Sequence, residues 1–575
     1  MILVGRFVWR YMRRYSMWYI AGSVLLVATN WLSTTIPLYL AQGIDGLALG
    51  AEGQAIVLRS ALTIAAMGAG VIVVRTGSRL LFFTPGRLVE ARVKADLFAS
   101  LLRHQPSFLT QWPTGDLVSR ASSDVTTTRL LAGFASLGVI NTAVALVLTL
   151  VQMTRISPEL TLVVVLPVTL AFAVTLGFVG RLFTILRRLQ AQTADLSTQI
   201  LSTYQGIATV HAFNAEECFQ EQLEHHNEAY LKTSLERAQM RTVIGPLLVL
   251  ASSASVFLLL YVGGPLAIQG EITIGELIAF TTLIAYLTGP LRGMSFILSL
   301  VKRSQASLER IDAICAPKPD RPDLPNPSAP PEAAPAFEIR DLSFAYPGAE
   351  EQALKNLSFT IPAGSTLGVF GHTASGKTTL LAVLSRLYNP PAGTLYVDGV
   401  DLRDIDLDAW RETATLVAQR AFLFSESIED NILLGEADGE KLERMLSLAA
   451  LEQDIQAMPE GVKTIVGEAG MRLSGGQRQR VAIARGLARD KTVLLLDDVL
   501  SAVDHSTEAQ LLQGLRKQRS ATTVIVAHRI SALMDADNIL VLENGEQRDM
   551  GTHEELINRD GPYRMAWQLQ QEELV

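Results

Sequence analysis

Cysteine is almost absent from this chain of 575 residues. Its two cysteines, Cys218 and Cys315, lie in segments that we expect to face the cytosol, so no disulfide framework is implied. An excess of positive charge is also lacking, because the formal net charge is −8. General attraction to nucleic acid is therefore excluded, and we expect no nucleic-acid partner, although a local basic patch would escape this test.

Lysine and arginine are missing from two long stretches, one between Arg14 and Arg59 and one between Arg241 and Arg292. A helix that crosses a membrane needs about 20 apolar residues. Six segments qualify: 17–41, 58–83, 130–154, 158–182, 243–267 and 274–300. Because lysine and arginine are enriched in short cytoplasmic segments, each stretch without them predicts two helices joined by an outward turn. Both termini are then expected on the cytoplasmic side of a lipid bilayer.

The domain organisation follows from changes in composition along the chain. Segments 86–128 and 181–241 carry both charges in a helical pattern, which predicts helices that continue into the cytosol and fold back at their tips. The proline-rich stretch 316–336 predicts an extended linker. After the linker, the sequence pattern predicts short strands that alternate with helices. We therefore predict a multi-domain membrane protein, with an all-α six-helix transmembrane domain (1–315) followed by an α/β P-loop domain (337–575).

Three strongly polar residues in the first two predicted membrane helices have both a functional and a structural interpretation. Asn30 lies near the middle of the first helix, where a hydrogen bond to another helix is favoured over contact with a ligand. Arg75 and Arg79 come late in the second helix. We expect both arginines at or beyond the inner interface, where their stems allow the charged ends to reach water.

A phosphate-binding pattern, G-x-x-x-x-G-K-[ST], lies in the α/β domain between a predicted strand and a predicted helix. The predicted nucleotide-binding residues are Gly371, His372, Thr373, Ala374, Ser375, Gly376, Lys377, Thr378 and Thr379. Backbone N–H groups would surround the phosphates, Lys377 would bind the β- and γ-phosphates, and Thr378 would ligate Mg²⁺. Asp497 ends an apolar strand and is the second predicted magnesium ligand, with a solvated strand end as the alternative. The predicted cofactors are ATP and Mg²⁺.

Five further motifs carry a resemblance to a known family. They are LSGGQRQR (473–480), VIVAHR (524–529), TGDLVSRASSDV (114–125), GIATVHAFNAEE (206–217) and SLERI (307–311). With the phosphate loop, they resemble the ATP-binding cassette (ABC) transporters, and in particular the type IV, exporter-fold half-transporters. The resemblance covers nearly the whole chain except the linker. It implies an ATP-driven transporter that works as a dimer of two half-transporters. The compact half-transporter layout makes a bacterial inner membrane the expected location.

The resemblance also implies roles for single residues. Tyr346 would stack on adenine, Gln419 would sense the metal and the γ-phosphate, and His528 would orient the γ-phosphate and the attacking water. Asp504 would communicate across the dimer. The signature residues Ser474, Gly475, Gly476 and Gln477 would contact the nucleotide held by the other subunit. The alternatives are a core position for Tyr346 and a surface position for Gln419.

The residue after Asp497 departs from the family pattern. Hydrolysing members have glutamate there as the catalytic base, whereas this chain has Asp498, which is one methylene shorter. A misplacement of about 1 Å can cost about 10²-fold in rate. Ala374 stands where glycine is usual, which is permitted if φ is negative and is expected to alter but not abolish binding. Ala469, in GEAGMR, stands where arginine is common. We therefore predict slow hydrolysis at this chain's own site.

These departures resemble the degenerate-site subunit of a heterodimeric exporter, whose partner would supply the catalytic glutamate. A homodimer with an active Asp498 is the alternative. Other possibilities are a siderophore importer of the same fold and a membrane protein that binds ATP without pumping. The sequence does not distinguish among small-molecule, lipid and peptide substrates.

Overall fold

The computed structural model describes residues 2–317, 327–436, 438–501, 505–517 and 521–572. The chain divides into two units. The first unit comprises Met1–Leu102 and Thr114–Pro317, and the second comprises Arg103–Pro113 and Lys318–Val575. The short segment Arg103–Pro113 therefore belongs with the α/β unit, although it lies within the predicted transmembrane domain.

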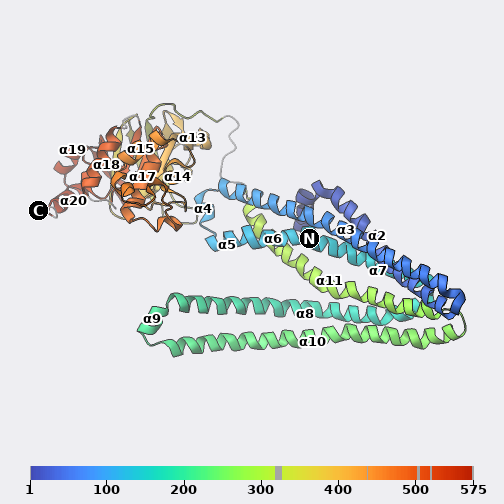
Figure 1. Ribbon diagram of the computed structural model, residues 1–575. Coiled ribbons are helices and arrows are strands. Elements are labelled where there is room, and N and C mark those ends of the chain that lie inside the picture. The colour runs from blue at the N-terminus through green and yellow to red at the C-terminus, as the bar shows by residue number, and fades with distance from the viewer. Residues whose placement is uncertain (1, 318–326, 437, 502–504, 518–520, 573–575) are drawn as a thin grey trace. The chain divides into compact units, whose positions relative to one another are not determined.

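The described residues of the first unit form helices joined by short turns (Figure 1). Its longer helices are α2 (Ser16–Ala48), α3 (Gln54–Arg103), α7 (Ser136–Ile156), α8 (Pro158–Gln205), α10 (Glu216–Ile268) and α11 (Ile274–Cys315). Shorter helices are α1 (Ile2–Phe7), α5 (Thr114–Ser119), α6 (Val125–Leu130) and α9 (Ile207–Ala212). Helical turns at Val8–Tyr15, Gly50–Gly53, Arg120–Asp124 and Leu131–Ala135 link these pieces.

The helices include 6 candidate membrane spans by length and composition. They are Leu3–Ala48, Gly50–Arg103, Thr114–Ile156, Pro158–Gln205, Val249–Ile268 and Ile274–Cys315. The prediction of six membrane helices is confirmed in this sense. Most of these helices are far longer than a bilayer requires, because they continue into the charged extensions.

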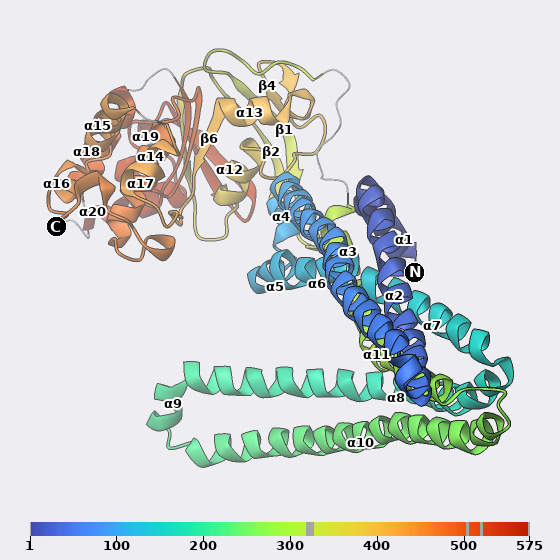
Figure 2. The ribbon, with the colours of Figure 1, turned by 45° about the vertical axis from the view of Figure 1, so that its right-hand side comes forward.

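The helices α8 and α10 run side by side and are joined at their tip by α9 (Figures 1 and 2). This hairpin confirms the predicted fold-back of the second charged segment. Figure 2 shows α11 returning along α2 and α7, whereas the tip of the hairpin stands apart from those helices. The hairpin tip therefore has no covering helix from the described part of the first unit.

Two predicted motifs meet near the end of α11. Arg310 forms ion pairs with Asp116 and, at 3.1 Å, with Asp124. Ser307 donates a hydrogen bond of 2.9 Å to Asp124, and Arg120 pairs with Asp116 at 2.8 Å. These contacts join the segment that follows Pro113 to the last turns of α11.

The second unit contains two sheets. The first is antiparallel with the order β2-β1-β4-β5, and the second has the order β10-β9-β3-β8-β7-β6 with parallel pairing from β9 to β6. The strands are β1 (Phe337–Phe344), β2 (Leu354–Ile361), β3 (Thr366–Phe370), β4 (Leu395–Val397), β5 (Val400–Asp401), β6 (Ala414–Val417), β7 (Val493–Asp497), β8 (Thr522–Val526), β9 (Asn538–Glu543) and β10 (Glu546–Gly551). The carboxyl ends of β3, β6, β7 and β8 therefore share one edge of the second sheet.

The helices of the second unit cover these sheets. They are α4 (Pro106–Leu109), α12 (Lys377–Leu384), α13 (Leu407–Thr413), α14 (Ile428–Leu433), α15 (Gly439–Leu448), α16 (Glu452–Gln456), α17 (Gly475–Leu487), α18 (His505–Lys517), α19 (His553–Asn558) and α20 (Pro562–Glu572). Leu494, Leu496 and Ile483 belong to one buried apolar cluster, and Leu367, Val369 and Leu495 belong to another. Successive residues of β7 thus face two different cores. Burial on both faces holds this strand, and with it Asp497, in position.

Candidate nucleotide-binding site

The phosphate loop joins β3 to α12, as the sequence predicts. A side chain at Gly371 would place its Cβ 2.3 Å from the backbone oxygen of Leu542, so only glycine fits there. Gly376 has a φ of +100°, in the region that favours glycine. The two pattern glycines are therefore required by close packing and by backbone conformation respectively.

Lys377 is held inside the loop. Its Nζ atom donates hydrogen bonds to the carbonyl oxygens of Gly371 at 2.6 Å and His372 at 2.8 Å, and the residue is only 7% exposed. Burial lowers the pKa of the Lys377 ammonium group, while the nearby carboxylates of Asp498 and Asp497 act in the opposite direction. The ammonium group is thus placed at the loop that is predicted to receive the phosphates.

The two residues predicted to ligate magnesium lie side by side. The Thr378 hydroxyl donates a hydrogen bond of 3.1 Å to Oδ1 of Asp497, which is 4% exposed. Burial raises the pKa of the Asp497 carboxyl, and the hydrogen bond from Thr378 opposes this rise. A hydroxyl and a carboxylate are hard oxygen ligands, and Mg²⁺ is typically held by one or two such groups together with substrate phosphates. The donor set therefore fits this ion.

The three predicted catalytic residues meet at one carboxylate oxygen. Gln419, just after β6, donates a hydrogen bond of 3.1 Å from Nε2 to Oδ2 of Asp498. The Nε2 atom of His528, just after β8, lies 3.8 Å from the same oxygen. Asp498 has a φ of +47°, and its backbone N–H donates to Val526 at 3.0 Å. Strand order explains the cluster, because β7 lies between β6 and β8.

Tyr346 follows β1 and closes one side of the α12 start. Its hydroxyl is 3.0 Å from the Thr379 hydroxyl, and its ring contacts the Tyr388 ring edge to face with centroids 5.1 Å apart. The ring is only partly buried. Stacking of adenine on Tyr346 stays a prediction.

The signature residues form the exposed start of α17. The Ser474 hydroxyl accepts a hydrogen bond from the Gln477 N–H at 3.2 Å, and the Gln477 side chain accepts one from the Ser474 N–H at 2.9 Å. Gln477 also donates to Asp454 at 2.8 Å. Ser474 and Gly475 are exposed. The helix start is thus rigidly capped and open to solvent, while Asp504, the other residue predicted to act across a dimer, lies outside the described residues.

The backbone at Ala374 does not have the negative φ that would make alanine harmless at this position. Its φ is +66°, a left-handed conformation that costs a non-glycine residue roughly 1–2 kcal/mol. The condition under which alanine would be harmless is therefore not met. The phosphate loop carries local strain at the position where the family has glycine.

We expect Ala374→Gly to stabilise the protein. Relief of the strain is partly offset by the greater freedom of glycine in the unfolded chain, which leaves a net gain of about 0.5–1 kcal/mol. Thermal unfolding checks this, with Ala382→Gly in the middle of α12 as the control, which should destabilise by about 1 kcal/mol or more. Equal losses in both variants would show that Ala374 is not strained.

The comparisons with known proteins decide the family. A family model described as "ABC transporter transmembrane region" matches residues 19–291, and one described as "ABC transporter" matches residues 354–501. The "Multidrug resistance-like ATP-binding protein MdlA" of Escherichia coli (strain K12) is 31% identical over 99% of this chain and 97% of its own length. The chain belongs to the ABC transporter family. It is an ATPase whose activity is coupled to transport.

Other relatives agree with this assignment to the ABC transporters. The "ATP-dependent lipid A-core flippase" of Desulfotalea psychrophila is 30% identical over 84% of this chain and 85% of its own length. A solved structure, "Structure of a bacterial Atm1-family ABC exporter with ATP bound", has a TM-score of 0.82 and 24% identity, and the match covers 97% of this chain and 98% of that chain. The ABC exporter fold, with six apolar helices before the cassette, is therefore confirmed.

Sequence reasoning missed two features of this ABC transporter. Asp454, which fixes the Gln477 amide, lies in α16, outside every motif that the sequence presents. A cavity between the membrane helices brings together Asn30, Asn141 and Thr149. The only available signal for that cavity was the presence of polar residues in otherwise apolar helices.

Proposed function

We propose that this chain is one half of an ATP-driven exporter in a bacterial inner membrane, with its termini and cassette in the cytoplasm. Its own site binds ATP and Mg²⁺ but hydrolyses ATP slowly. The observation that supports this most is the short carboxylate of Asp498, which Gln419 holds by a direct hydrogen bond. Relatives named as a multidrug resistance-like protein and a lipid A-core flippase support the direction of transport.

The contacts in the proposed site support a separate role for each of its residues. Lys377 binds the β- and γ-phosphates, and the loop N–H groups surround them. Thr378, Asp497 and Gln419 would hold Mg²⁺, which offsets phosphate charge when bound. His528 orients the γ-phosphate and the attacking water. Among the described residues, Asp498 is the carboxylate that would take a proton from that water, and it falls short by one methylene.

A second subunit is needed in this proposal, and two surfaces support it. The capped signature start of α17 is exposed, which suits contact with a nucleotide bound elsewhere. The tip of the α8–α10 hairpin exposes large apolar side chains, with Tyr204 at 77% and Phe213 at 79% exposure. Exposed aromatic residues beside a buried anchor such as Val210 are typical of protein contacts.

We propose that the second subunit is a different half-transporter. Asp498, Ala374 and Ala469 all depart from the family pattern, whereas the signature that a partner's site would use is intact. The relatives match as single chains of similar length, so a homodimer is the second candidate. In either assembly, ATP drives the switch because it binds the closed cassette dimer more tightly than the open one.

A glutamate-to-glutamine substitution in the partner tests the heterodimer. In a reconstituted complex of this chain with its candidate partner, replacing the partner's catalytic glutamate should remove nearly all phosphate release, because only that site holds a base of full length. Asp498→Asn in the same complex should change the turnover little. A complex that keeps most of its turnover after the partner substitution would contradict the assignment.

A further inference from the structure

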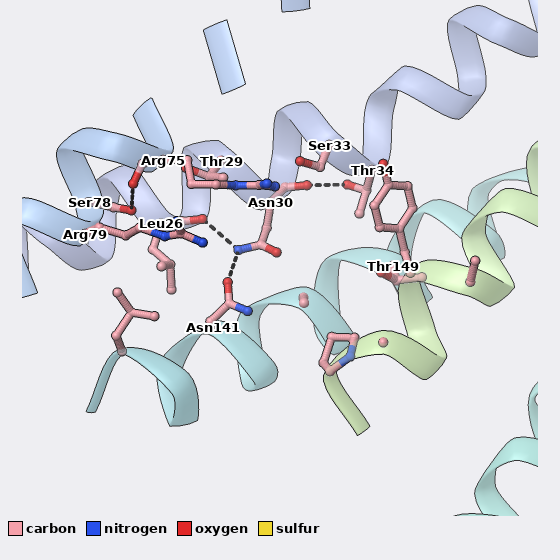
Figure 3. A pocket seen from close by; sticks show the side chains of 16 residues that line it. Leu26, Thr29, Asn30, Ser33, Thr34, Arg75, Ser78, Arg79, Asn141 and Thr149 are labelled. Atoms are coloured by element: carbon pink, nitrogen blue, oxygen red, sulfur yellow. Dashed lines mark hydrogen bonds between the residues drawn. The ribbon is translucent and has the colours of Figure 1, made fainter. Parts of the chain in front are cut away.

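A cavity of about 250 Å³ lies among four helices of the first unit. It is lined by residues of α2, α3, α7 and α11, so its walls come from membrane-spanning segments (Figure 3). Leu26, Leu137 and Ala145 form part of the wall, while the remaining lining includes several polar side chains. The cavity is therefore amphipathic.

The charge of this cavity has one sign. Arg75 and Arg79 line it from successive turns of α3, and no aspartate or glutamate is among its lining residues. Neither guanidinium group has an ion pair or side-chain hydrogen bond among the residues that the structure describes. Figure 3 shows both arginines close to Asn30 at the cavity. Both arginines are exposed and border this cavity, and the expectation that they lie at or beyond the inner interface stays a prediction.

Uncharged polar groups surround these arginines. Asn30 donates hydrogen bonds to Oδ1 of Asn141 at 3.0 Å and to the Leu26 carbonyl at 2.9 Å, which confirms the predicted interhelical bond. The Asn141 amide group remains available as a donor. Thr149 is completely buried, and its hydroxyl has no hydrogen-bond partner among the described residues. A buried hydroxyl without a partner is costly, and here it belongs to the wall of the cavity.

We propose that this cavity binds the anionic head group of an amphiphilic transport substrate. Two guanidinium groups would make charge-assisted hydrogen bonds to a phosphate or carboxylate, and Asn141 and Thr149 would donate to its remaining oxygens. The apolar wall from Leu26 to Ala145 accommodates the start of the hydrocarbon part. This inference rests on the proposed export function and narrows its substrate to one chemical class.

Charge reversal in small amphiphiles tests the proposal. Hexyl phosphate and hexyltrimethylammonium share a tail and differ in head-group charge, and equilibrium dialysis measures their binding to the reconstituted protein without ATP. We expect hexyl phosphate to bind and hexyltrimethylammonium not to. Arg75→Gln/Arg79→Gln should weaken hexyl phosphate about 100-fold, because two charge-assisted contacts are lost. Arg59→Gln, on the same helix but outside the cavity, should leave binding unchanged.

Further variants separate the contacts within the cavity. Arg75→Lys/Arg79→Lys should recover part of the affinity, because the charge remains but the planar fork is lost. Thr149→Val should weaken hexyl phosphate several-fold while thermal unfolding stays close to that of the wild type. Equal binding of the two amphiphiles, or undiminished binding by the glutamine double variant, would overturn the proposal.

The source of the anion is decided in the same experiment. If inorganic phosphate binds the cavity as tightly as hexyl phosphate does, the proposal of an amphiphilic substrate is overturned. The cavity would then be a site for free anions. Competition by phosphatidylglycerol in nanodiscs would identify a lipid head group, whereas its absence would identify a soluble amphiphile. ATP turnover measured on each preparation keeps the two proposals separate. Loss of ATP turnover with hexyl phosphate still bound would contradict the pump and leave the cavity assignment standing.

Discussion

Replacing Asp498 by glutamate is expected to raise the ATPase rate of the purified chain about 100-fold. The added methylene moves the carboxylate toward the position from which it can take a proton from the attacking water. A displacement of about 1 Å is enough to change a rate by about 10²-fold. The rest of the site is in place, since Gln419 and His528 already surround this side chain and Asp497 precedes it.

The measurement is phosphate release from the chain alone, reconstituted in lipid, where every site meets this chain's own intact signature. Asp498→Asn keeps the length but removes the base, so it should lower the residual rate and leave ATP binding intact. A brisk rate in the unmodified chain, with no gain from glutamate, would mean that Asp498 works through a water molecule. The homodimer would then be the better assignment.

Much of the site follows from local sequence. The phosphate loop, Asp497 and the capped signature each depend on a short pattern whose backbone requirements are specific, such as the glycine at 371. The apolar runs likewise located the membrane helices. These features could be predicted because neighbours in the chain determine them.

Other features depend on neighbours that are distant in the chain. The bond between Gln419 and Asp498 arises because β6 and β7 pair in parallel, which the motifs alone do not specify. The direction of Arg75 depends on how α3 is rotated against its neighbouring helices, and helix rotation is set by packing. The positive φ of Ala374 is set by the loop as a whole. For these reasons the sequence located the arginines along the chain but not their cavity.

Replacing Asp497 by asparagine should have opposite effects on stability in the absence and presence of Mg²⁺ and ATP. Burial raises the pKa of this carboxyl in the folded protein. The folded state therefore binds a proton more tightly than the unfolded state. Its stability falls as pH rises from the ordinary carboxyl range through the raised pKa, and the full penalty remains at higher pH. Asparagine avoids this penalty, so the nucleotide-free variant should unfold at a higher temperature than the wild type.

With Mg²⁺ and ATP the order should reverse. The wild type gains stability from binding, whereas asparagine offers a neutral ligand and gains much less. Hydrolysis should fall by about 10³-fold, because a bound metal ion contributes several kcal/mol to such reactions. Calorimetry at neutral pH, with and without MgATP, measures both signs on the same two proteins.

The matched control is Thr413→Val, at the end of α13. It removes a buried hydroxyl elsewhere in the cassette, so it should lower the unfolding temperature by the same amount with and without MgATP. Asp497→Asn differs from this control because it removes a charge. In the wild type that carboxylate charge destabilises the empty site, and it binds the metal ion in the filled site. A nucleotide-free Asp497→Asn protein less stable than the wild type would show that Thr378 and Lys377 fully compensate the buried Asp497 charge.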